Sequence, residues 1–92
     1  MLNENAQTLF GDFIKQSRDY LALPGIMAAL ELDKLCMQLY PIVARQLGDL
    51  ALSNSIRDFG RSLPRKQPEE LQTLFDDILS QAQSAGLAPA DD

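Results

Sequence analysis

Proline and glycine divide the chain into segments long enough to form helices. Pro24-Gly25, Pro41, Gly48, Pro68 and Gly86 separate stretches in which apolar residues recur every three or four positions. Strict alternation of apolar and polar residues, which is typical of strands, is not sustained. Proline disrupts a helix interior and glycine favours helix ends, so this arrangement predicts an all-α protein with short connections.

The apolar periodicity predicts at least four helices, at about residues 5–23, 26–40 and 49–59 and from Pro68 to a cap at Gly86. Pro41 either kinks the second helix or starts a short extra helix that ends at Gly48. A break could instead fall at Ser53-Asn54-Ser55, and residues 60–67 form a linker. We expect residues 1–86 to be one domain, a four- or five-helix up-and-down bundle, and residues 87–92 to be a frayed acidic tail.

The segment from Ile26 to Tyr40 is apolar over an unusually wide arc. On a helical wheel its apolar positions span roughly 220°, and only Glu31, Lys34 and Gln38 form a polar stripe. A 92-residue chain buries a modest core. We therefore expect this helix to be central, to lie in an interface with a second chain, or both, and we predict a homodimer.

The sequence lacks the side chains that most catalytic mechanisms require. It has no histidine and a single cysteine, Cys36, which excludes Ser–His–Asp and Cys–His catalysis and zinc sites built from Cys and His. No phosphate-binding glycine motif occurs. We expect no enzyme activity, cofactor or metal. The carboxylate pairs Glu69-Glu70 and Asp76-Asp77 leave a carboxylate-only enzyme or metal site as an alternative, but a dipole effect at the helix start together with a solvated face is the favoured explanation.

Asp33 is the most informative single residue, because it falls inside the wide apolar arc. A buried carboxylate without a partner is costly, so Asp33 must be paired, protonated or exposed. One interpretation pairs it internally with Arg45 or Arg57, and the other makes it an anchor for a partner or a second copy. Met37 and Tyr40 lie on the same helix and join Asp33 as candidate partner-binding residues.

A basic segment precedes the last predicted helix. The segment has a local charge of +3 (four minus one), from the basic residues Arg57, Arg61, Arg65 and Lys66 and the acidic residue Asp58. By contrast, every charged residue from Pro68 onward is acidic. These four basic residues complete the set of candidate partner-binding residues. The alternatives are a basic linker that lies against the acidic last helix, or one that is simply solvated.

The overall balance of charge favours a protein partner. A net charge of −5 disfavours binding to nucleic acid and to anionic membranes, and the charged residues and prolines between Leu21 and Val43 exclude a membrane span there. A lone cysteine and the absence of a signal-peptide pattern indicate the cytoplasm. We predict an interaction module, such as an adaptor, chaperone, regulator or inhibitor of a larger protein, that acts through apolar helical surface. The alternatives are a nucleic-acid-associated regulator that uses residues 57–66, and an acidic mimic that blocks a nucleic-acid-binding site.

Overall fold

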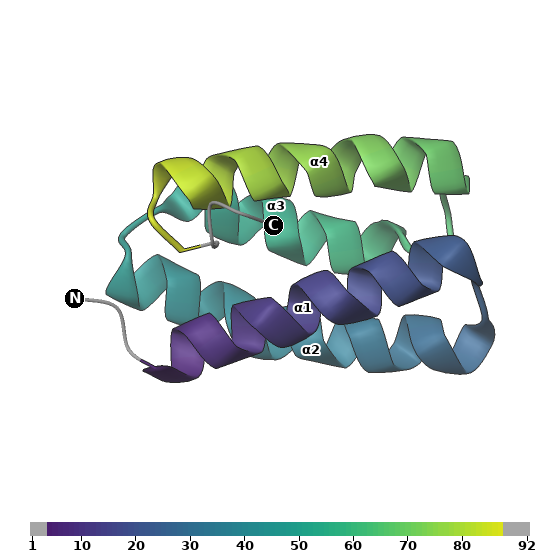
Figure 1. Cartoon of the computed structure of the whole chain (residues 1–92), viewed down its shortest axis with the longest axis horizontal. Helices are drawn as coiled ribbons and strands as arrows, with labels where there is room; N and C mark the ends of the chain where they lie inside the picture. The colour runs from purple at the N-terminus through teal and green to yellow at the C-terminus, as the bar shows by residue number, and fades with distance from the viewer. Residues whose placement is uncertain (1–3, 88–92) are drawn as a thin grey trace.

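Four antiparallel helices form an up-and-down bundle in a computed structural model, which describes residues 4–87 (Figure 1). The helices are α1 (Glu4–Ala22), α2 (Ile26–Gln46), α3 (Leu50–Ser62) and α4 (Pro68–Ser84). Each packs on the next in the chain, α4 closes the bundle against α1, and no strand occurs within the described range. The all-α bundle expected from the periodicity is confirmed, with four helices rather than five.

Pro41 lies inside α2 and neither ends the helix nor starts a new one. The helix ends at Gln46 with Leu47 as its C-cap, and Gly48 directly after the cap adopts a positive φ of 65° that favours glycine. Asp49 then caps α3, because its carboxylate accepts a hydrogen bond of 3.0 Å from the Leu52 N–H. The expected end at Gly48 is therefore correct, and the alternative of an extra short helix after Pro41 is wrong.

The serine-rich stretch in α3 does not interrupt the helix. Ser53 Oγ donates a 2.7 Å hydrogen bond to the Tyr40 carbonyl oxygen of α2, and Ser55 Oγ donates a 2.9 Å bond to the Ala51 carbonyl oxygen. The Ser53 hydroxyl therefore finds its acceptor in another helix, and the Ser55 hydroxyl shares the Ala51 carbonyl oxygen with the backbone bond of α3, which a carbonyl oxygen with two lone pairs can accommodate. The helix extends to Ser62, so the connection to α4 is shorter than the predicted linker of residues 60–67.

The C-terminal end of α4 closes with a Schellman motif. Gly86 has a φ of 78°, its N–H bonds to the Gln83 carbonyl oxygen, and the Leu87 N–H bonds to the Ala82 carbonyl oxygen over 2.8 Å. Leu87 is buried and joins the core, although its position in the sequence predicted a place in the frayed tail. The rest of that tail, residues 88–92, lies outside the described residues.

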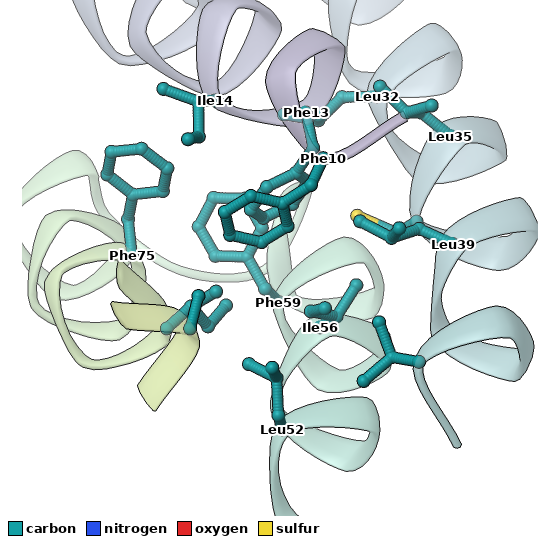
Figure 2. Close-up of a cluster of buried hydrophobic side chains, with 14 of the residues drawn as sticks. Phe10, Phe13, Ile14, Leu32, Leu35, Leu39, Leu52, Ile56, Phe59 and Phe75 are labelled. Carbon is teal, nitrogen blue, oxygen red and sulfur yellow. The ribbon is translucent and has the colours of Figure 1, made fainter. Parts of the chain in front are cut away.

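The core combines aromatic side chains from three helices with aliphatic side chains from α2 (Figure 2). All four phenylalanines take part: Phe10, Phe13, Phe59 and Phe75 have neighbouring ring centroids 5.5–6.1 Å apart. From α2, only residues after Leu30 are buried, namely Leu32, Leu35, Cys36, Leu39 and Val43. The N-terminal turns of α2 therefore contribute nothing fully buried to the core.

Candidate protein-interaction surface

The first turns of α2 and the connection before it carry large apolar side chains in solvent. Leu23 is 80% exposed, Ile26 82%, Met27 71% and Leu30 54%. Leu30 follows Met27 by three residues and Ile26 by four, which places it beside both on the surface of one helix. We call these four residues the apolar surface; exposed apolar groups gathered in one place are unusual for a monomeric protein.

The lengths of the helices explain why this surface is uncovered. α2 has 21 residues and α3 has 13, or about 31 Å against about 20 Å at 1.5 Å per residue. Tyr40 is level with Ser53, and Asp33 with Gly60, so the register places the end of α3 at Ser62 beside the second turn of α2. The part of α2 that precedes its second turn therefore extends beyond the end of α3, and no helix covers it on the side of α3.

The register is held by a close approach between α2 and α3. A β-carbon on Gly60 would lie 2.8 Å from Asp33 Oδ1 and 2.9 Å from the Cys36 β-carbon. At the same end of the bundle, the buried Tyr20 hydroxyl donates a hydrogen bond of 3.2 Å to the Leu63 carbonyl oxygen. These contacts fix the chain where α1 and α3 end.

A surface hollow of about 820 Å³ lies between the N-terminal half of α2 and the end of α3. Its apolar wall includes Pro24, Ile26, Ala29 and Leu30, and its charged groups are Asp33, Arg61 and Arg65. A smaller hollow of about 320 Å³ lies between α1 and α2, where Leu23 and Ala28 meet the polar residues Gln16, Asp19 and Glu31. The apolar surface therefore stands between two hollows, each with a polar edge.

Asp33 is half-buried, and it forms no ion pair with any residue that the structure describes. The ion pairs in the described part of the chain are Lys15–Asp19, at 3.9 Å, and Arg57–Asp58, at 3.6 Å. The internal pairing of Asp33 with Arg45 or Arg57 is thus not present, since Arg45 Nε instead bonds to the Pro41 carbonyl oxygen. The carboxylate lies against Gly60 and faces the larger hollow.

The structure brings together some of the predicted partner-binding residues and separates others. Asp33, Arg61 and Arg65 line one hollow, whereas Lys66 is exposed in the connection outside it. Arg57 is half-buried on α3, and its Nε is a buried donor without a hydrogen bond within the described residues. Met37 is 58% exposed and Tyr40 is half-buried.

The sequence showed that α2 carries more apolar surface than a small core can cover. It did not show which of these apolar residues stay exposed. Leu23, Ile26, Met27 and Leu30 were absent from the predicted partner-binding set. Periodicity alone assigns apolar residues to a face, and it cannot tell which part of that face a shorter neighbour leaves open. The one available signal was the predicted length of the second helix against that of the third.

Cys36 is an inert core residue. Burial, together with the nearby Asp33 carboxylate, raises the pKa of its thiol to about 12. Within residues 4–87, no three His, Cys, Asp or Glu side chains gather as a metal site, and no helix has the length and hydropathy of a membrane span. The chain matches no protein-family model, no curated protein and no solved structure at a significant level.

Proposed function

We propose that this chain is a small acidic interaction module that binds another protein through the apolar surface at the α1–α2 connection. The observation that carries the proposal is the exposure of Leu23, Ile26 and Met27, each more than two thirds in solvent. Covering one such side chain is worth about 1.5–3 kcal/mol. A partner that covered several of them would gain enough to bind specifically, despite the cost of association.

The surroundings of the apolar surface support a specific site. The two hollows can accept side chains of a partner, and their edges carry charged groups such as Asp19, Glu31 and Arg61. An apolar centre with a polar rim is the usual anatomy of a protein interface. Met27 also adapts its shape to a partner, because the methionine side chain is unbranched and flexible.

Adaptors, chaperones, regulators and inhibitors of larger proteins all act in this way, by binding without catalysis. The absence of histidine supports a role of this kind, because the most common general acid and base is missing. The lone, buried Cys36 is compatible with the reducing cytoplasm, which we propose as the compartment.

Affinity capture with matched baits tests the proposal. The tagged chain and the variant Leu23→Asp/Met27→Asp are each incubated with extract of the native cell, and retained proteins other than the chain itself are identified by mass spectrometry. Leu23 and Met27 are 80% and 71% exposed, so aspartate at these positions leaves the fold intact. We expect a protein that the unaltered chain retains to be lost from the variant.

The control bait is Leu50→Asp, which changes a leucine that is 66% exposed at the start of α3, at the opposite end of the bundle. It should retain the same protein as the unaltered chain. Identical sets of proteins on all three baits would show that the apolar surface binds no other protein, and the proposal would then be wrong.

A further inference from the structure

The larger hollow is lined by one acidic and two basic side chains that form no ion pair with one another. Asp33 stands on α2, Arg61 on α3 and Arg65 in the α3–α4 connection, and all three line the same space. Neither ion pair in the described part of the chain includes any of them. A carboxylate and two guanidinium groups beside Ile26 and Leu30 therefore present a polar pattern that an occupant of the hollow must match.

A second copy of the chain matches this pattern. In a twofold symmetric interface, if one residue contacts a second residue across the axis, the second contacts the first in return. An axis that passes between Asp33 and Arg61 would place each carboxylate opposite the guanidinium groups of the other protomer. We propose that the chain forms an antiparallel homodimer through this hollow, in which Asp33 of each protomer pairs with Arg61 and Arg65 of the other.

The sequence of α2 fits helix-to-helix contact in such a dimer. Ile26, Leu30, Asp33, Met37 and Tyr40 follow one another in steps of four, three, four and three residues. This spacing places the five side chains in one stripe along α2. Asp33 is the only charged residue in that stripe, so its pairing with the arginines of the other protomer fixes the register of the two chains.

This inference rests on the proposed function in one respect, since both make the apolar surface a binding site. The dimer uses the side that carries Ile26 and Leu30 and that borders the larger hollow. Leu23 borders the smaller hollow on the α1 side, which the dimer leaves free for another protein. Failure of the dimer therefore leaves the capture experiment above unaffected.

Sedimentation equilibrium of charge-swapped variants tests the pairing. Asp33→Arg and the double variant Arg61→Asp/Arg65→Asp are each measured alone, from micromolar to millimolar concentration, and then mixed in equal amounts. The unaltered chain should sediment at twice its 10.2 kDa mass. Each variant alone places like charges opposite each other twice per dimer, so its Kd should rise at least about tenfold.

The mixture separates pairing between protomers from pairing within one. In a heterodimer, the arginine introduced at position 33 of one protomer meets the two introduced aspartates of the other. Across the same interface, the original Asp33 meets the original Arg61 and Arg65. We expect the mixture to regain the mass of the dimer. An unaltered chain that remains monomeric throughout, or a mixture that stays monomeric while the unaltered chain dimerises, would overturn the inference.

The carboxylate of Asp33 lies against Gly60, so a substitution of Asp33 could disturb the fold. Two variants of exposed apolar residues therefore test the same interface without changing Asp33. Ile26→Lys changes a side chain that is 82% exposed, and Leu50→Lys one that is 66% exposed, so both should fold normally by circular dichroism. The dimer should dissociate in Ile26→Lys and persist in Leu50→Lys. Equal dimerisation of these two variants would also contradict the proposed interface.

Discussion

Gly60 of α3 lies so near Cys36 of α2 that a β-carbon on the glycine would come within 2.9 Å of the Cys36 β-carbon. The Cys36 β-carbon is fixed to the backbone, so it cannot move aside without a shift of α2. This contact aligns α3 with α2 from the second turn of α2 onward. It thereby decides that the first turns of α2, with Ile26 and Met27, extend past the end of α3.

We expect Gly60→Ala to destabilise the fold. The added methyl group overpacks the contact at a cost of about 1–3 kcal/mol, which exceeds the gain of about 1 kcal/mol in helix propensity. Gly11→Ala is the matched control, because Gly11 lies within α1 and a β-carbon added there would meet no neighbour within 4 Å. Urea unfolding should show a loss for the first variant and a gain for the second. Stabilisation by both changes would show that the two helices are not in close contact.

The hydrogen bond from Tyr20 to the Leu63 carbonyl oxygen should contribute measurably to stability. Tyr20→Phe removes the 3.2 Å bond and leaves a buried carbonyl oxygen without this partner, at a cost of about 0.5–1.5 kcal/mol. The hydroxyl of Tyr40 makes no hydrogen bond within the described residues, so Tyr40→Phe should have a smaller effect. Thermal unfolding of both variants compares the two, and an equal loss would contradict the assignment.

The Cys36 thiol should resist modification in the folded chain. A rise in its pKa from 9.0 to about 12 lowers the thiolate fraction near neutral pH about a thousandfold, and burial blocks access in addition. The rate of maleimide labelling at mildly alkaline pH should therefore be very low in buffer and high in urea. Labelling that is equally fast under both conditions would place Cys36 on the surface.

Loss of exposed and of buried apolar residues should affect stability very differently. Leu23→Gln and Met27→Gln change side chains that are 80% and 71% exposed, so each should shift the free energy of unfolding by no more than about 0.5 kcal/mol. Leu39→Ala, in the fully buried part of α2, should cost about 2–5 kcal/mol. A large loss from either glutamine variant would mean that the apolar surface belongs to the core.

The local order of the chain follows from its sequence. Pro68 at the start of α4, Gly48 after α2 and Gly86 after α4 mark boundaries through their own conformational limits, which operate without any neighbour. The three- and four-residue spacing of apolar side chains identified the buried faces, because this spacing follows from the geometry of a single helix. The hydroxyl of Ser53 could bond either within its own segment or to another helix. Its acceptor is a carbonyl oxygen of α2, so the sequence did not predict that the helix continues through Ser53.

The arrangement of the surface was decided by the tertiary structure. The sequence marked residues 26–40 as too apolar for a small core, but only the packing of a 13-residue helix on a 21-residue one determined that Ile26, Met27 and Leu30 stay in solvent. The sequence likewise marked Asp33 and the basic segment separately, 24 or more positions apart. The antiparallel register of α2 and α3 places Asp33, Arg61 and Arg65 around one hollow, because contact between helices depends on their relative position and not on separation along the chain.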